Sequence, residues 1–335
     1  MLPIIMAGAA LLAAVGGLKA SKNRRPTPGV GGLPMPQPVP GPPAAPLRQD
    51  MLVFNSDRTG NHEIFTMRAD GTQQRQITND PRVDSWWGRA SPDRRRILFY
   101  RAPRGVHDTD YRQVELWMMN ADGSYPRLLL ARGAYGWALH GHAEWSPDGR
   151  QLVMFGGGLS PQIFITDTEG RSPRQITSRA GVNLDPSWSP DGRRIVFVSC
   201  PSAVCAERDY EIFTVPAAGG AVTRLTANEL RDHDPYWSPD GRRIAWLAET
   251  GPGKWGPVGA WDVLIMNADG TSQFRLTSDG QINSKPHWSL DGQSLYFHRL
   301  VPGEGTPWTI WRMRADGTGR TALTTASQGN NEYPA

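Results

Sequence analysis

The chain has 335 residues, with 36 Lys and Arg against 32 Asp and Glu, and a sequence pI of about 9.2. The positive excess lies in residues 1–50, which contain five basic residues and one acidic residue, so the remainder carries 31 of each sign. A domain without net charge lacks the basic surface that phosphate backbones require, and this excludes nucleic acid as an expected partner.

Residues 1–25 begin with an uncharged, Ala- and Gly-rich run from 2 to 18 and continue as a basic cluster from 19 to 25. A helix of this apolar run reaches about 25 Å, just under the hydrocarbon thickness of a bilayer. We favour a retained membrane anchor, on which Ala9, Ala13 and Gly17 lie on one helix face and let another transmembrane helix approach closely. A cleaved signal peptide without a basic n-region and a disordered tail remain alternatives.

Residues 26–49 form a linker. Its segment 26–46 contains nine prolines and four glycines, which favour extended polyproline II structure with a reach of about 65 Å. The linker is long enough to hold the following domain away from a membrane. Alternatively, it lies along a partner protein, as Pro-rich segments often do.

Residues 50–335 are built from repeats. Trp-Ser-Pro-Asp-Gly begins at Trp145, Trp188 and Trp237, and degraded copies are Trp288-Ser-Leu-Asp-Gly and Ala90-Ser-Pro-Asp-Arg. The tryptophans are 43, 49 and 51 residues apart, a period typical of β-propeller blades. Each copy predicts a tight turn between two strands, because Pro, Asp and Gly favour the backbone angles of such turns.

A second turn, of the Ala-Asp-Gly type, occurs six times, whereas the Ser-Pro-Asp-Gly type occurs five times. One blade therefore lacks its first strand at the N-terminal end. The last residues, Asn331-Glu-Tyr-Pro-Ala335, match the run that precedes each repeat Trp, as in 183–187. The sequence thus predicts an all-β, six-bladed propeller closed by a C-terminal clasp strand.

The Asp-Pro-x-Trp-Ser-Pro-Asp-Gly run, the Ile-Phe-x-Met-x-Ala-Asp-Gly run and the closing Leu-Thr together resemble the repeats of TolB-like six-bladed propellers. The resemblance covers about 285 residues. It implies the fold strongly but the function weakly, because such blades occur in periplasmic adaptors, in gating domains of peptidases and in some carbohydrate lyases. It also implies an extracytoplasmic location.

Two features bear on the side of the membrane. The basic cluster after the apolar run favours a cytoplasmic side under the positive-inside rule. Cys200 and Cys205, the two cysteines of the chain, fall in one loop, where they either form a disulfide typical of an oxidising compartment or remain free thiols. The possible disulfide and the family resemblance together lead us to expect the propeller on the extracytoplasmic side of the membrane.

The propeller has two different faces. The two kinds of short turn share one, here called the turn face. Longer and more varied loops share the other, here called the loop face. Aromatic residues on these loops, Tyr111, Tyr135, Trp137 and Trp255, are expected to be exposed and to bind a partner, with packing onto their own blades as the alternative.

Residues five and three positions before each repeat Trp are expected to surround the central channel. They are His140 and His142, Asn183 and Asp185, Asp232 and Asp234, Asn283 and Lys285, and Asn331 and Tyr333. His140, His142, Asp185, Asp232 and Asp234 are candidate ligands for a divalent ion at the channel mouth, a region where some lyases with related propellers use a metal. However, Lys285 brings a positive charge there, and such Asp and Asn residues commonly bond neighbouring backbone amides.

We therefore expect no catalytic residue, metal or cofactor. The predicted function is a non-catalytic, membrane-tethered, protein-binding propeller, an adaptor or accessory subunit of a secretory, transport or electron-transfer complex in the cell envelope. The alternative is a propeller enzyme or a protein that binds small molecules or carbohydrates through a metal at the channel mouth.

Overall fold

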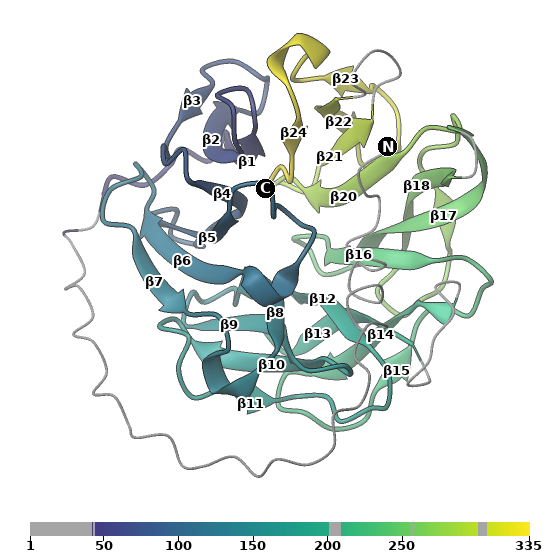
Figure 1. Cartoon of the computed structure of the whole chain (residues 1–335). Helices are drawn as coiled ribbons and strands as arrows, with labels where there is room; N and C mark the ends of the chain where they lie inside the picture. The colour runs from purple at the N-terminus through teal and green to yellow at the C-terminus, as the bar shows by residue number, and fades with distance from the viewer. Residues whose placement is uncertain (1–41, 43, 201–208, 256–257, 301–306) are drawn as a thin grey trace.

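Six four-stranded antiparallel sheets follow one another around a central axis (Figure 1). The computed structural model describes residues 42, 44–200, 209–255, 258–300 and 307–335. Ala9, Ala13 and Gly17 of the expected anchor, and most of the linker, lie outside these ranges. Within the described ranges no helix is long and apolar enough to cross a membrane.

Each blade has four strands in the following order from the channel outward. Blade 1 is β24 (Asn331–Glu332), β1 (Met51–Ser56), β2 (Glu63–Arg68) and β3 (Arg75–Gln76); blade 2 is β4 (Val83–Ala90), β5 (Arg96–Pro103), β6 (Glu115–Asn120) and β7 (Arg127–Leu130); blade 3 is β8 (Leu139–Trp145), β9 (Gln151–Gly157), β10 (Gln162–Asp167) and β11 (Arg174–Gln175). Blade 4 is β12 (Asn183–Trp188), β13 (Arg194–Ser199), β14 (Glu211–Pro216) and β15 (Thr223–Arg224); blade 5 is β16 (Asp232–Trp237), β17 (Arg243–Trp255), β18 (Val258–Asn267) and β19 (Phe274–Arg275); blade 6 is β20 (Asn283–Trp288), β21 (Ser294–Leu300), β22 (Trp308–Arg314) and β23 (Thr321–Ala322). Short 3-10 helices are η1 (Tyr111–Gln113), η2 (Ala134–Gly136) and η4 (Ala326–Gln328).

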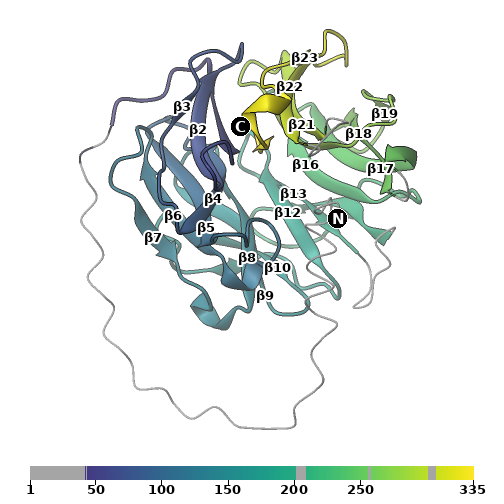
Figure 2. The same cartoon turned by 45° about the horizontal axis from the view of Figure 1, so that its top comes forward.

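The C-terminal clasp is confirmed. Strand β24 pairs antiparallel with β1, with Asn331 opposite Ser56 and Glu332 opposite Asn55. Ala335 then exchanges two backbone hydrogen bonds with Val53, of 2.8 and 2.9 Å. The C-terminus accordingly lies between blade 1 and blade 6 (Figures 1 and 2), and the first and last parts of the propeller are joined by backbone hydrogen bonds.

The turns form as their residues predict. In the turn after β8, Gly149 has φ 68°, and its amide donates to the Ser146 carbonyl. Ser146 Oγ donates to Asp148 Oδ1 at 2.6 Å, and the same pair occurs in the other four turns of this type. In blade 2, Arg94 occupies the position of the glycine with φ 61°. Its amide still donates to the Ser91 carbonyl, and its guanidinium Nη2 also donates to the carbonyls of Met51 and Arg48.

In five blades the side chain of the threonine that ends the repeat accepts a backbone hydrogen bond that the short outer strand does not provide. In blade 1 the backbone amide of Ile64 donates to Thr78 Oγ1 at 2.8 Å, just beyond the two-residue strand β3. The equivalent bonds reach Thr177, Thr226, Thr277 and Thr324. The outer strand can therefore be short without leaving a buried amide unsatisfied.

Both faces of the second strands are buried between neighbouring blades. In β13 all residues but Arg194 are buried, which explains why its sequence is a continuous apolar run rather than an alternating one. Cys200 follows this strand; it is fully buried and disulfide-bonded, while Cys205 lies outside the described residues.

Candidate functional site

Each blade has one residue with a left-handed backbone in its inner strand or, in blade 1, directly after it. These residues are Trp87, His142, Asp185, Asp234, Lys285 and Tyr333, with φ between 50° and 59°. In β4, β8, β12, β16 and β20 they coincide with a shift of strand register, as in a β-bulge. A left-handed Trp, Lys or Tyr is uncommon and costs free energy, so the repeated geometry identifies a structurally demanding position.

These six residues, here called the channel ring, contact one another in a closed circuit. Asp185 pairs with His142 Nδ1 through Oδ1, and its Oδ2 accepts from the backbone amide of Asp234 at 3.4 Å. Lys285 Nζ donates to Asp234 Oδ1 at 2.5 Å and lies 5.0 Å from the ring centroid of Trp87. Trp87 in turn stacks on His142, with centroids 4.2 Å apart, and contacts Tyr333 at 5.3 Å.

The second nitrogen of His142 is also occupied. His142 Nε2 and Tyr111 Oη are 2.8 Å apart, and Asp108 accepts from the hydroxyls of both Tyr111 and Tyr333. All members of the ring are at most 7% exposed. The channel is therefore filled at this level by side chains that are hydrogen-bonded or stacked with one another.

The ring already contains a cation for its carboxylates. Burial acts to raise the pKa of Asp185, but the charges of His142 and Lys285 outweigh it and hold that pKa well below its ordinary value. Burial likewise acts to lower the pKa of Lys285, and the carboxylates of Asp234 and Asp185 raise it above its ordinary value. Donor atoms of His142, Asp185 and Asp234 lie within 4.8 Å of one another, a spacing compatible with a metal, but the Lys285 ammonium competes for the same oxygens.

The residues five positions before the repeat Trp make different contacts. Asp232 accepts from Trp246 Nε1 at 2.9 Å and from Asn228 Nδ2 at 3.1 Å, and burial raises its pKa to about 7. His140 is 1% exposed, and burial lowers its pKa to about 4. Among the candidate ion ligands, the structure thus groups His142, Asp185 and Asp234 together and places His140 and Asp232 outside the ring's contacts.

The expected exposure of the loop-face aromatics was wrong for two of four residues. Tyr111 is 4% exposed because η1 folds over the channel and brings its hydroxyl to His142. Trp137 is 8% exposed and packs on Phe164 with centroids 4.4 Å apart. Tyr135 is 50% exposed, while the side chain of Trp255 lies outside the described part of the chain.

A cavity of about 260 Å³ opens on the turn face, and the sequence analysis did not identify it. It is lined by residues that include Arg89, Glu144, His287, Leu290 and Ala335. Arg89 Nε donates to Glu144 Oε1 at 2.6 Å, and the Tyr236 hydroxyl donates to the same oxygen at 2.9 Å. One repeat position, directly before the repeat Trp or its equivalent, is occupied by Arg89, Glu144, Tyr236 and His287. Polar residues at this shared position were the signal in the sequence that could have indicated a site on this face.

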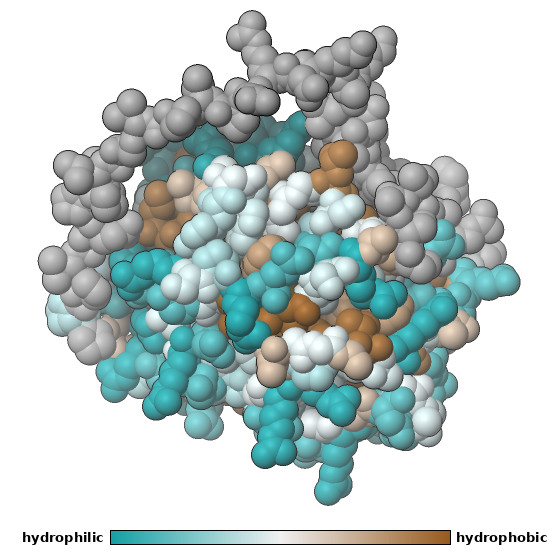
Figure 3. Space-filling model, turned by 90° about the horizontal axis from the view of Figure 1, so that it is seen from below, coloured by the Kyte–Doolittle hydropathy of each residue, from teal (hydrophilic) through white to brown (hydrophobic). Residues whose placement is uncertain are grey.

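Large apolar side chains are exposed at only a few described positions. They are Tyr125, Tyr135, Leu159, Phe274 and Leu290. One side of the molecule shows mainly polar and charged residues with apolar areas between them (Figure 3). Leu290, 57% exposed, is the member of this set that lines the turn-face cavity, so this opening combines an apolar side chain with buried charges.

Comparison with known proteins agrees with this architecture. The TolB beta propeller domain family matches residues 138–254. TolB from Acinetobacter baumannii superposes with a TM-score of 0.64 at 19% identity, covering 85% of this chain and 66% of that chain. A TolB structure from Agrobacterium tumefaciens gives a TM-score of 0.62 at 19% identity, covering 84% and 95%. The protein is a six-bladed β-propeller similar in fold to TolB, and residues 138–254 match the TolB propeller domain.

A curated relative, an uncharacterized protein of Agrobacterium fabrum, is 31% identical over 104 residues. The match covers 30% of this TolB-like chain and about a third, 34%, of the relative. An oligogalacturonate lyase solved in complex with manganese has a TM-score of 0.50 at 15% identity, covering 82% and 72%. At such low identity the solved structures demonstrate the shared fold alone.

Proposed function

We propose that this TolB-like propeller is a non-catalytic, protein-binding subunit that acts as an adaptor in a cell-envelope complex. The observation that carries the proposal is the turn-face cavity, which has a volume of about 260 Å³ above a channel ring whose polar groups are paired with one another. Its exposed Leu290 and its buried Arg89–Glu144 pair suit an extended protein segment with an apolar side chain and a polar backbone.

Two further features support an extracytoplasmic, tethered form. Cys200 is disulfide-bonded, and disulfides persist mainly in oxidising compartments. The apolar run 2–18 and the Pro-rich segment 26–46 would supply an anchor and a spacer of about 65 Å. On this proposal the native protein begins at or near Met1 and fractionates with membranes, and a bulky residue at Ala13 releases it from its complex without unfolding the propeller.

A photo-crosslinking amino acid at Leu290 tests the binding site in living cells. We expect a specific crosslinked partner from Leu290 and none from Phe274, which is 51% exposed and does not line the cavity. A crosslink from Tyr135 alone would instead place the partner on the loop face. Absence of a crosslink from both Leu290 and Tyr135 would contradict the protein-binding proposal.

The second candidate is a metal-dependent enzyme or a protein that binds small molecules or carbohydrates at the channel. It is favoured by the clustering of His142, Asp185 and Asp234. Metal analysis of the wild type and of the double variant His142→Ala, Asp234→Ala distinguishes the two candidates. Stoichiometric metal that disappears in the double variant would support this second function.

A further inference from the structure

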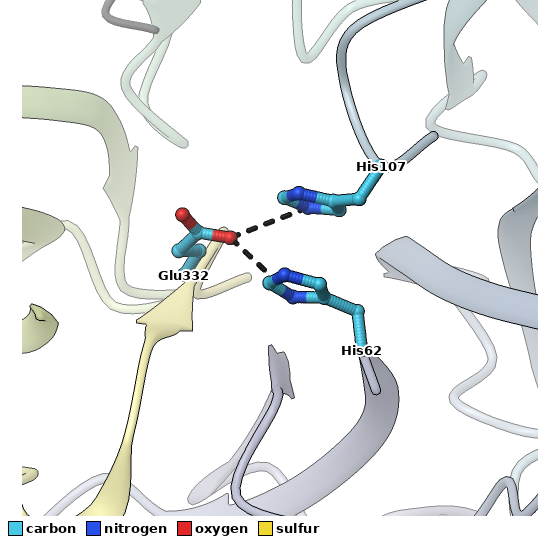
Figure 4. A group of neighbouring side chains, drawn as sticks. All are labelled: His62, His107 and Glu332. Atoms are coloured by element: carbon cyan, nitrogen blue, oxygen red, sulfur yellow. Dashed lines mark ion pairs between the residues drawn. The ribbon is translucent and has the colours of Figure 1, made fainter. Parts of the chain in front are cut away.

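A second group of side chains of metal-ligating types lies where the clasp closes the propeller, and it adjoins the channel ring through Tyr333. His62 precedes β2 in blade 1, His107 lies in the loop after β5 in blade 2, and Glu332 belongs to the clasp strand β24 (Figure 4). Both imidazoles face the Glu332 carboxylate. Glu332 Oε2 is 3.2 Å from His107 Nε2 and 3.8 Å from His62 Nδ1.

The backbone of this group is held by one buried carboxylate. Asp84 accepts from the His62 amide through Oδ1 at 3.1 Å and from the Gly105 amide through Oδ2 at 2.6 Å. The His107 amide lies 3.4 Å from the same Oδ2. Asp84 is 2% exposed, so a side chain of blade 2 fixes both histidine-bearing segments relative to each other.

The residues that follow His107 and Glu332 are also connected. Tyr333 donates from its hydroxyl to Asp108 Oδ2 at 2.5 Å, which ties the clasp to the loop of blade 2. The two imidazoles are stacked, with centroids 3.6 Å apart and planes 8° from parallel. The three side chains therefore belong to a connected arrangement rather than to separate flexible loops.

Two buried polar atoms of this arrangement make no hydrogen bond among the described residues. They are His107 Nε2, whose contact with Glu332 Oε2 is an ion-pair contact alone, and Asn55 Oδ1. Asn55 Nδ2 donates to Glu332 Oε2 at 3.2 Å and lies 3.2 Å from His62 Nδ1. If the side-chain amide of Asn55 were turned by 180°, its oxygen would lie beside His62 Nδ1 and Glu332 Oε2 and could join them as a metal ligand.

The surroundings of this group are rich in carboxylates. Asp84 accepts from the backbone amides of His62 and Gly105, Asp108 directly follows His107, and Asp57 accepts from the Asn330 side chain next to the clasp strand. A divalent ion held by the three side chains would offset part of this negative charge.

We propose that His62, His107 and Glu332 bind a divalent transition-metal ion of the zinc class, which pins the clasp to blades 1 and 2. Two histidines and one glutamate are an established donor set for zinc, with ligand distances of about 2.0–2.2 Å. Tetrahedral donors at such distances are about 3.3 Å apart, close to the 3.2 and 3.8 Å observed, so modest tilting of the stacked imidazoles is sufficient. The side chains of His62 and His107 are 15% and 13% exposed, so the group lies near the surface, and the fourth ligand would be a water molecule.

Metal titration of the full-length protein, without a histidine tag and stripped with a chelator, tests the site. We expect one equivalent of Co²⁺ to give the visible absorption of a tetrahedral complex, Zn²⁺ to displace it, and Zn²⁺ to raise the melting temperature by several degrees. Glu332→Gln should weaken Zn²⁺ binding at least tenfold. Because glutamine has almost the shape of glutamate and its oxygen can still accept from Asn55 Nδ2, the melting temperature of this variant without metal should remain close to that of the wild type.

Asp234→Asn is the matched control, since it removes a carboxylate from the channel ring and leaves the clasp donors intact. Because Asp234 is the buried partner of Lys285, circular dichroism first verifies that this variant is folded. Retention of the bound Zn²⁺ by the folded variant supports the clasp site, whereas its loss from the folded variant would overturn the proposal in favour of the channel. If Asp234→Asn does not fold, His142→Asn serves as the control. Equal Zn²⁺ binding by the wild type and Glu332→Gln, or no binding by the wild type at 100-fold excess, would also overturn it. If Glu332→Gln does not fold, His62→Asn provides the same comparison.

Discussion

Lys285 Nζ lies 2.5 Å from Asp234 Oδ1 inside the propeller channel, and the two side chains are 8% and 4% exposed. This buried pair joins blade 6 to blade 5 and is one link of the channel ring. The ring therefore fills the axis and also couples neighbouring blades, so its ionic links should contribute to stability.

Removal of one partner of this pair should strongly destabilise the protein. Lys285→Met leaves the Asp234 carboxylate buried without its counter-charge, and such changes typically cost about 3–5 kcal/mol. Urea denaturation measures the loss. The control is Arg48→Met, which breaks the ion pair with Asp50; because those side chains are 67% and 42% exposed and the solvent screens their charges, its effect should be far smaller. Equal effects of the two substitutions would show that the buried pair has no special role.

The repeat pattern predicted the ring because equivalent sequence positions occupy equivalent places in each blade. Counting the two turn types was likewise sufficient to predict six blades and the clasp, since every strand needs a partner. Burial of Tyr111 and Trp137 was not predictable in this way. Their loops differ from blade to blade, and their positions depend on contacts with His142 and Phe164.

The group at the clasp was not predictable from the repeat pattern for a related reason. His62, His107 and Glu332 occupy three different repeat positions in three segments, and they meet only because β24 returns to pair with β1. The turn-face cavity was more accessible to prediction, because Arg89, Glu144, Tyr236 and His287 share one repeat position.

Acidification should destabilise the protein partly through His140. Burial lowers its pKa to about 4 in the folded state, whereas the unfolded value is about 6.5. Between these values the unfolded chain binds a proton that the folded chain does not, so the free energy of unfolding falls as pH decreases from about 6.5 to 4. At pH 5 the His140 contribution should have fallen by about 2 kcal/mol relative to pH 7.

Denaturation of His140→Phe at pH 7 and pH 5 tests this assignment. The variant should lose less stability between the two pH values than the wild type does, whatever its stability at pH 7. The informative quantity is the difference between the two pH values, because repacking around the new ring affects both measurements equally. Identical pH dependence in the two proteins would exclude His140 as a source of acid sensitivity.

The disulfide at Cys200 predicts that the native protein has no reactive thiol. Titration with a thiol reagent should detect none before reduction and two after unfolding with a reductant, because the chain contains two cysteines. Closure of a small loop by a disulfide is worth about 2 kcal/mol, so reduction should lower the melting temperature moderately. Two free thiols in protein isolated from its native compartment would argue against an oxidising location.

Deletion of residues 330–335 should destabilise the whole propeller rather than its end alone. The deletion removes the pairing of β24 with β1, the two hydrogen bonds between Ala335 and Val53, and the buried side chain of Tyr333. Blade 1 would then lose its inner strand, and its exposed edge would leave β1 amides and carbonyls unsatisfied. We expect a fall in melting temperature well beyond that of Ser327→Ala, a substitution at an exposed position in the same C-terminal segment. An unchanged melting temperature after the deletion would mean that the blades remain closed without the clasp.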